Sequence, residues 1–110
     1  MIEVLTTEDF DKWLRKLKDR TGRLRIVERI DRLANGNPGD VRPVGQGISE
    51  LRLTYGPGYR VYYLQDGDLL ILLLIGGDKS SQQNDIEKAQ ELAYEWRADR
   101  QRKEDPDEHH

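Results

Sequence analysis

One uninterrupted run of large aliphatic residues, from Leu69 to Ile75, is the strongest constraint on the fold of this 110-residue chain. The run has seven residues, whereas a helix that spans a bilayer needs about 20. A short aliphatic run without polar residues is typical of a strand that is buried on both faces of a sheet. The run therefore predicts a central strand with packed layers on either side.

The segments around this run also have the period of strands. Residues 48–55 and 59–65 alternate between apolar and polar side chains, and Gly56-Pro57-Gly58 separates them as a turn. Asp66-Gly67 signals a hairpin that leads into the aliphatic run. Two shorter strands are expected as well, at residues 2–5 and 41–44.

Three other segments have apolar residues at helical spacing. We expect Thr6 to be the N-cap of the first helix, and Ser80 with Gln83 to form a capping box before the last one. We expect Tyr94 to pack within the last helix. The three apolar stripes are Phe10, Trp13, Leu14 and Leu17; Leu24, Val27, Ile30 and Ala34, with Ile26 and Leu33 beside them; and Ile86, Ala89, Ala93 and Trp96, with Leu92 alongside.

The order β-α-α-β-β-β-β-α predicts one α+β domain over residues 1–98. Its architecture would be a small, twisted antiparallel sheet with two N-terminal helices and a C-terminal helix. Residues 99–110 are mostly charged, and we expect them to form a disordered tail. The first residues are acidic and contain no apolar signal segment, so we expect a cytoplasmic protein without a membrane partner.

The net charge of −3 hides an uneven distribution of charge. Residues 20–65 hold eight arginines and four acidic residues, whereas residues 66–99 hold three basic and eight acidic residues. The net charge of −3 therefore does not argue against binding of nucleic acid at the arginine-rich middle of the chain. Two solvated faces of opposite charge are an equally good interpretation of this pattern.

Several kinds of catalytic site are excluded by composition. The chain has no cysteine, and its two histidines are the last two residues, His109 and His110. It therefore offers no thiol nucleophile and no histidine-based catalytic or metal site within the domain. It also lacks a phosphate-binding P-loop. We expect neither a cofactor nor a metal.

A group of polar residues on neighbouring strands remains. Glu50 and Arg52 share a face of one predicted strand, Arg60 and Tyr62 share a face of the next, and Lys79 follows the glycine pair after the aliphatic run. Arginine and lysine suit a phosphate-like substrate and its transition state. Glutamate and tyrosine can transfer protons, and tyrosine can stack on a base. From spacing alone, exposed strand residues and ordinary sheet packing are the preferred interpretation.

Three motifs at these positions resemble the RelE/ParE toxin superfamily. They are ELR at residues 50–52, GPGYRVYY at 56–63, and GGDKSSQQ at 76–83 followed by Asp85-Ile86. Within the superfamily, the chain is most similar to the HigB-like, phage-related addiction module killer proteins. The resemblance covers residues 1–97. It implies a toxin of a type II toxin–antitoxin system, with the fold described above.

The resemblance also implies an activity and partners. RelE- and HigB-like members are metal-independent, ribosome-dependent endoribonucleases, or mRNA interferases. The ribose 2′-OH is their nucleophile, and the products carry a 2′,3′-cyclic phosphate and a 5′-OH. The implied partners are the ribosome, mRNA and a cognate antitoxin, often a helix-turn-helix HigA-like protein, with promoter DNA bound only through the antitoxin complex.

Carried over to this chain, the resemblance assigns phosphate binding and stabilisation of the phosphorane to Arg52, Arg60 and Lys79. It makes Tyr62 and Glu50 candidates for proton transfer or base stacking. The chain departs from RelE-type enzymes because it is not strongly basic and has no histidine in its core. Two alternatives therefore stay open: a ParE-like DNA gyrase inhibitor that acts by binding, and a decayed toxin that only binds its antitoxin.

Overall fold

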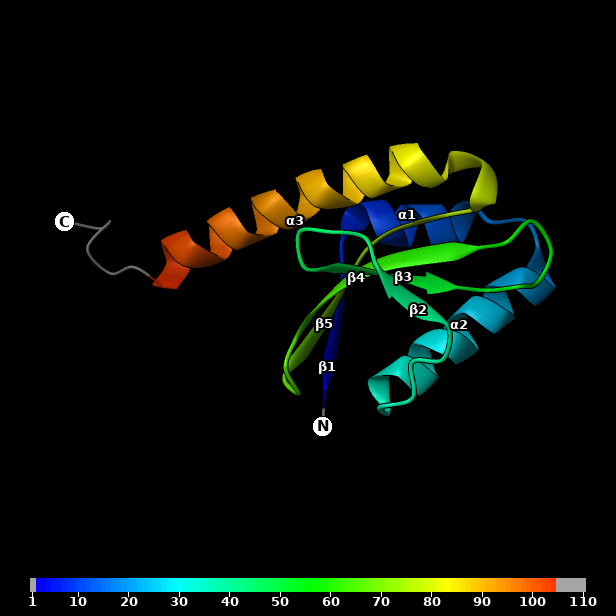
Figure 1. The fold of residues 1–110 in the computed structure, drawn as a ribbon, viewed down its shortest axis with the longest axis horizontal. Helices are drawn as coiled ribbons and strands as arrows, with labels where there is room; N and C mark the ends of the chain where they lie inside the picture. The colour runs from blue at the N-terminus through cyan, green and yellow to red at the C-terminus, as the bar shows by residue number, and fades with distance from the viewer. Residues whose placement is uncertain (1, 105–110) are drawn as a thin grey trace.

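Five strands form a single sheet in the computed structural model, which describes residues 2–104 (Figure 1). Two helices separate the first strand from the other four, and two more follow the last strand. In chain order the elements are β1 (Glu3–Thr6), α1 (Glu8–Lys16), α2 (Arg20–Ala34), β2 (Val41–Pro43), β3 (Ile48–Arg52), β4 (Arg60–Asp66), β5 (Leu70–Gly77), the short 3₁₀ helix η1 (Lys79–Ser81) and α3 (Gln82–Glu104). This architecture confirms the predicted α+β class.

The sheet is mixed, and not antiparallel throughout as the sequence predicts. Its strand order is β1-β5-β4-β3-β2, and β1 runs parallel to β5 while the other pairs are antiparallel. The chain leaves β1 through two helices and re-enters the sheet at the opposite edge. No hairpin therefore sets the direction of β1, which is free to pair in parallel with β5.

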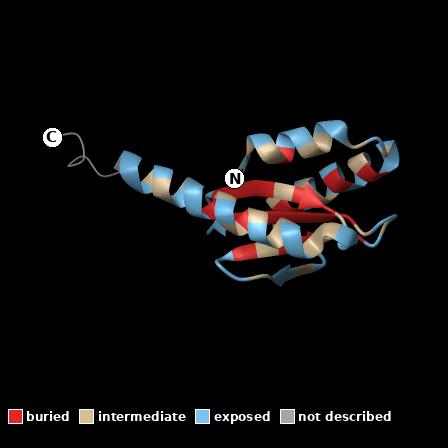
Figure 2. Cartoon of the chain, turned by 90° about the horizontal axis from the view of Figure 1, so that it is seen from above, coloured by how far each residue is buried: buried red, intermediate tan, exposed pale blue. Residues whose placement is uncertain are grey.

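The sheet lies between two layers of helix (Figure 2). On one face, Ile71 and Leu73 of β5 pack in a cluster with residues of α1 and α2. On the other face, Leu72 and Leu74 pack in a cluster with Ala89 and other residues of α3. We call these the α1–α2 face and the α3 face. The prediction that the aliphatic run is a strand buried on both faces is confirmed from Leu70 onward, whereas Leu69 precedes β5 and is 72% exposed.

The first helix begins one residue later than expected. Thr6 belongs to β1, and Thr7 is the N-cap of α1: its side chain accepts a hydrogen bond from the Phe10 N–H at 3.0 Å. The same hydroxyl donates to the carbonyl of Leu74 at 2.6 Å, which ties α1 to β5. The predicted N-cap was wrong because Thr6 is needed for pairing with β5.

The exposed side of α2 also differs from the predicted stripe. Ile26 and Leu33 are the apolar residues that α2 buries, whereas Leu24 is 65% exposed and Val27 48% exposed. Tyr94 on α3 is 76% exposed, so the prediction that it packs within the helix is wrong. Helical spacing alone allowed either side of α2 to face the sheet, and the tertiary packing selects one of them.

The start and the end of α3 are further corrections. Asp78 caps η1, accepting a hydrogen bond from the Ser80 N–H at 2.8 Å, and no capping box joins Ser80 to Gln83 within the described residues. The helix then continues through Glu104, so residues 99–104 are helical where a disordered tail is expected. Residues 105–110 lie outside the described part. Within residues 2–104, no helix is long and apolar enough to cross a bilayer.

Candidate functional site

The pairing of β3 with β4 brings the two predicted polar sets together. Arg52 lies directly opposite Arg60 in the register, and Glu50 lies opposite Tyr62. Residues that face each other across antiparallel strands lie on the same side of the sheet, and here this is the α3 face. Lys79 comes to the same end of the sheet because η1 follows β5, and its backbone N–H bonds to the carbonyl of Pro57 at 3.4 Å.

Glu50 is at the centre of this arrangement and is completely buried. Three guanidinium groups lie around its Oε1: the Nε atoms of Arg42, Arg52 and Arg60 are 3.1, 3.7 and 3.9 Å away. Only the Arg42 contact is also a hydrogen bond. Buried charges in proteins are normally paired, and Glu50 is the shared counter-ion of three cations.

The second carboxylate oxygen of Glu50 accepts two hydrogen bonds. The Tyr62 hydroxyl donates at 2.9 Å and the Gln82 side-chain amide donates at 2.8 Å. Burial raises the pKa of Glu50, but these hydrogen bonds and Arg42 outweigh burial and hold the pKa below its ordinary value. Burial and the bond to Glu50 raise the pKa of Tyr62. At neutral pH the glutamate is therefore charged and the tyrosine is protonated.

A cleft of about 290 Å³ opens beside this buried pair. We call it the main cleft. Arg52, Arg60 and Lys79 line it, whereas Glu50 and Tyr62 are not among its lining residues. The full lining is Asp40, Arg52, Leu53, Thr54, Gly56, Pro57, Gly58, Arg60 and Lys79.

The guanidinium groups in the main cleft are held in place, but not all of their N–H donors form hydrogen bonds. Arg60 is only 5% exposed, and its Nη1 donates to the carbonyls of Gly58 at 2.9 Å and Tyr59 at 3.3 Å. The Nε atoms of Arg52 and Arg60 are buried and have no hydrogen-bond partner within residues 2–104. These two Nε atoms face Glu50 Oε1 at 3.7 and 3.9 Å, so they contribute ion pairs to the buried carboxylate without forming hydrogen bonds to it.

The turn that forms one wall of the main cleft is anchored to α2. Asp19 is the N-cap of α2, and it accepts hydrogen bonds from the hydroxyls of Tyr59 at 2.9 Å and Tyr55 at 3.3 Å. Burial and the bond to Asp19 raise the pKa of Tyr59 to about 12, so this link persists at neutral pH. Gly56 and Gly58 have φ of 57° and 78°, which explains why the turn contains glycine.

Two residues of the site were missed in the sequence. Arg42 lies on edge strand β2 opposite Glu50, and Gln82 begins α3. The sequence marks 41–44 as a strand but does not say which strand it pairs with. Gln82 belongs to the GGDKSSQQ motif, and its sequence position alone indicates an ordinary residue in the first turn of the last helix. Within residues 2–104, no group of three or more acidic, histidine or cysteine residues is arranged to hold a metal ion.

A family model described as phage-derived protein, Gp49-like, matches residues 12–94. The chain belongs to the Gp49-like family. An uncharacterised protein of Haemophilus influenzae is 49% identical to this Gp49-like chain over 94 residues, which cover 86% of the chain and 95% of the relative.

Two solved structures are also similar. A chain of the Escherichia coli RelBE toxin–antitoxin complex superposes with a TM-score of 0.55 at 19% identity, over 68% of this chain and 93% of that one. The conserved hypothetical protein HP0894 of Helicobacter pylori has a TM-score of 0.47 at 22% identity, over 73% and 97% of the two chains. The match to the RelBE chain shows that the Gp49-like chain shares its fold, which we call the RelE-type fold, and it confirms the fold that the resemblance to the RelE/ParE superfamily implied.

Proposed function

We propose that this Gp49-like chain is the toxin of a type II toxin–antitoxin system and a metal-independent endoribonuclease that cuts mRNA on the ribosome. The observation that carries the proposal is the main cleft. There Arg52 and Arg60, from paired strands, and Lys79, from η1, line a single space on a RelE-type fold. Arginine and lysine side chains around one space are suited to binding the negatively charged oxygens of a phosphodiester.

In the proposed reaction, one phosphodiester of the RNA enters the main cleft. The neighbouring ribose 2′-OH attacks the phosphorus, a bond from O2′ to phosphorus forms, and the bond from phosphorus to the leaving O5′ breaks. Arg52 and Arg60 stabilise the extra negative charge on the pentacoordinate phosphorus. Lys79, which is exposed, donates a proton to the leaving oxygen, and the proton of the 2′-OH passes to water.

We assign positioning roles to Glu50 and Tyr62. A charged, buried glutamate fixes the arginines around it, and a tyrosine with a raised pKa serves as a hydrogen-bond donor to that glutamate. Neither side chain lines the main cleft, so neither is assigned proton transfer with RNA. This assignment narrows the broader role that the sequence suggested for both residues.

The proposed partners are the ribosome with its mRNA and a cognate antitoxin in the cytoplasm. The RelE-type fold, shared with a chain of a toxin–antitoxin complex, supports an antitoxin partner. We propose a HigA-like helix-turn-helix protein for that partner, and promoter binding only through the complex with it. These assignments rest on the HigB-like motifs of the sequence.

One observation favours a second candidate, a ParE-like gyrase inhibitor that acts by binding. Glu50 and Tyr62, the two side chains suited to proton transfer, are buried and bonded to each other. The ionisable groups that line the main cleft are cations and Asp40. A cleft of this composition can also bind an anionic surface without cutting it.

Lys79→Ala tests the proposed function, with Lys16→Ala as a matched control because Lys16 is an exposed lysine on α1 outside the main cleft. We expect wild type to arrest growth and to leave codon-linked 5′ ends on mRNA, mapped by primer extension. Loss of the proton donor to the leaving oxygen slows cleavage about 100-fold or more. The free energy of unfolding of purified Lys79→Ala, measured in urea, should lie within about 0.5 kcal/mol of the wild-type value, because substitutions of exposed residues usually change stability little.

Purified ribosomes separate the two candidate functions. Cuts that require ribosomes and are absent with Lys79→Ala support the endoribonuclease. Growth arrest with loss of DNA supercoiling and intact mRNA would instead identify the gyrase inhibitor. If Lys79→Ala remains as toxic as Lys16→Ala, the main cleft is not the functional site.

A further inference from the structure

A second, smaller cleft of about 120 Å³ adjoins the main cleft. Leu53 and Thr54 line both clefts, so the two form one continuous surface at the end of β3. We call the second one the α2 cleft because most of its other residues come from that helix. They are Arg25, Glu28, Arg29, Arg32 and Tyr55.

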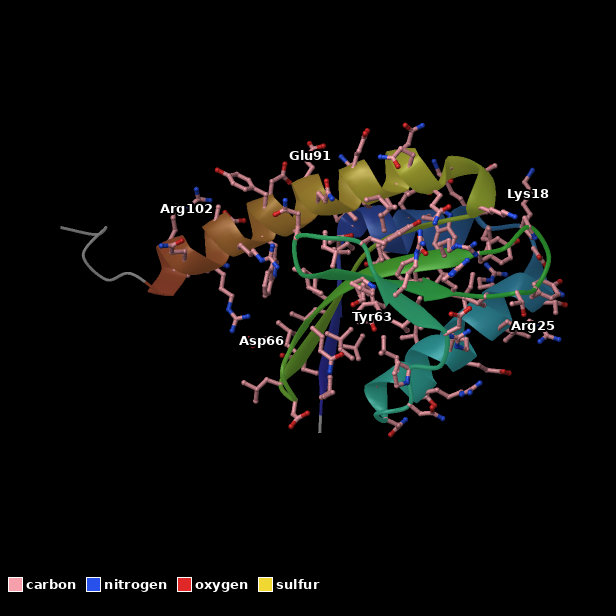
Figure 3. All side chains as sticks on the ribbon, in the orientation of Figure 1. Lys18, Arg25, Tyr63, Asp66, Glu91 and Arg102 are labelled. Carbon is pink, nitrogen blue, oxygen red and sulfur yellow. The ribbon has the colours of Figure 1, made fainter. Side chains whose placement is uncertain are left out.

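Arg25 is held by stacking on an aromatic ring. Its guanidinium carbon lies 4.9 Å from the centre of the Tyr55 ring, and the Tyr55 ring in turn stacks on Tyr59, with centroids 6.4 Å apart. Stacking fixes the plane of a guanidinium group while its N–H edge remains free for an anion. Arg25 extends outward from α2 (Figure 3), so that edge is accessible to a ligand.

Arg29 has a structural role in the same cleft, because its side chain is bonded to backbone carbonyls. Its side chain donates to the carbonyls of Arg52 at 2.7 Å, Pro38 at 3.0 Å and Asp40 at 3.4 Å. Burial, followed by the nearby Arg32, lowers the pKa of Arg29. Arg29 therefore braces the backbone at Arg52, and the cations left for a ligand are Arg25 and Arg32.

The charge of the α2 cleft is not cancelled locally. Arg25 and Arg32 are both exposed, and neither forms an ion pair with a carboxylate of the residues that the structure describes. Three arginines line the cleft against one acidic residue, Glu28. The cleft therefore attracts anions on a surface that continues from the main cleft.

We propose that the α2 cleft is a second phosphate subsite, in which Arg25 and Arg32 bind the backbone of single-stranded RNA next to the phosphodiester held in the main cleft. This inference rests on the proposed function and extends it. The Tyr55 ring already contacts the Arg25 guanidinium and stacks on Tyr59, so the contacts that we assign to the subsite are contacts to phosphate. Such contacts position a strand without reading its sequence.

The salt dependence of RNA binding tests this subsite. The probes are 2′-O-methyl oligoribonucleotides of two and of eight nucleotides, which lack the 2′-OH nucleophile and stay uncut. Their binding is followed by fluorescence anisotropy between about 50 and 300 mM salt. The double variant Arg25→Ala/Arg32→Ala is compared with Arg15→Ala/Arg23→Ala, which removes two arginines from a groove between α1 and α2.

We expect Arg25→Ala/Arg32→Ala to bind the eight-nucleotide probe about tenfold more weakly than wild type does. Its slope of log affinity against log salt should be shallower by about 1.4, since each phosphate contact to a single strand contributes about 0.7. The dinucleotide, which reaches only the main cleft, should bind with unchanged affinity. Arg15→Ala/Arg23→Ala should match wild type with both probes.

Three results would overturn the subsite. One is an unchanged slope in Arg25→Ala/Arg32→Ala, and another is an equal loss in both double variants. The third is a loss of binding to a polyglutamate peptide with RNA binding intact, which would assign the cleft to an acidic polypeptide. Failure here is distinct from failure of the proposed function: a protein that cuts mRNA on ribosomes but keeps its salt slope in the variant refutes only the subsite.

Discussion

The two faces of the β-sheet are built on different principles. On the α1–α2 face, the buried cluster consists of ten residues of the described chain, all of them aliphatic or aromatic. On the α3 face, an apolar cluster under α3 gives way, toward the end of β3 and the start of β4, to the buried pair of Glu50 and Arg60. Strand β3 contributes to both faces, because Glu50 points to the α3 face and its neighbour Leu51 points to the α1–α2 face.

The contrast separates stability from chemistry. Apolar side chains on the α1–α2 face stabilise the fold through burial and close packing. On the α3 face, buried charge carries a desolvation cost that is offset only because Glu50 has its arginines and hydrogen-bond donors in place. Changes on the first face should therefore act through volume, and changes on the second through charge.

Phe10→Ala should have the largest effect on the α1–α2 face. The Phe10 ring is buried against Trp13, with centroids 5.8 Å apart, and removing it leaves a cavity under α1. We expect a loss of about 4 kcal/mol in the free energy of unfolding, measured by urea titration with circular dichroism. Phe10→Leu, which keeps most of the volume, should lose less than half of that. Equal losses would mean that ring volume is not what this face depends on.

Glu50→Gln should destabilise the α3 face, because it removes the negative charge of Glu50 while the side-chain volume stays nearly constant. It leaves the arginines without their counter-ion, and we expect a loss of about 3 kcal/mol, at the low end for a broken buried pair because Arg42 and Arg52 are partly solvated. Glu91→Gln, which changes an exposed carboxylate on α3 (Figure 3), is the control and should change stability by less than about 0.5 kcal/mol.

The stability of wild type and of Glu50→Gln at different pH values tests whether Glu50 is charged in the folded protein. The pKa of Glu50 in the folded state lies below its ordinary value of 4.5. Its contribution to stability is therefore fully present above about pH 4.5 and is lost as the pH falls through the folded-state value. The stability gap between wild type and Glu50→Gln should be constant from pH 7 to about 5 and should shrink below that range. A gap that widens in acid would contradict a charged Glu50.

Gly76 and Gly77 should show the smallest effects and compare the faces directly. A Cβ on Gly76 would overlap the indole ring of Trp13 on α1, whereas a Cβ on Gly77 would meet the carboxylate of Asp85 on α3. A packed ring cannot move aside, but the end of an aspartate side chain can. We expect urea titration to give a loss of about 2 kcal/mol for Gly76→Ala and about 1 kcal/mol for Gly77→Ala. The reverse order would mean that the α3 face is the more rigid one.

Much of the fold follows from the sequence because strand and helix periods are local. The alternation at residues 48–55 and 59–65 and the aliphatic run gave the right strands, and the two faces of β4 were predicted correctly. The parallel pairing of β1 and the buried side of α2 were not predictable in this way. Both depend on contacts between segments far apart in the chain.

In the candidate site too, local sequence patterns predicted some features, whereas others depend on contacts between distant segments. Arg52, Arg60 and Lys79 were predicted to lie together, and they line one cleft. The burial of Glu50 was not predicted, because it depends on Arg42 from edge strand β2 and on Gln82 from α3. A sequence shows that a carboxylate stands among arginines, but only the packing of three separate elements shows that it faces them and not the substrate.

The pairing of β1 with β5 has a consequence for the order of folding. The Thr7 hydroxyl bonds to the Leu74 carbonyl across 67 residues of sequence, and among the described strands β1 pairs with β5 alone. Closing so long a loop slows folding more than it reduces final stability. During synthesis, α1 and α2 leave the ribosome long before the strand that completes their core. The α1–α2 face therefore cannot close until most of the chain has been translated.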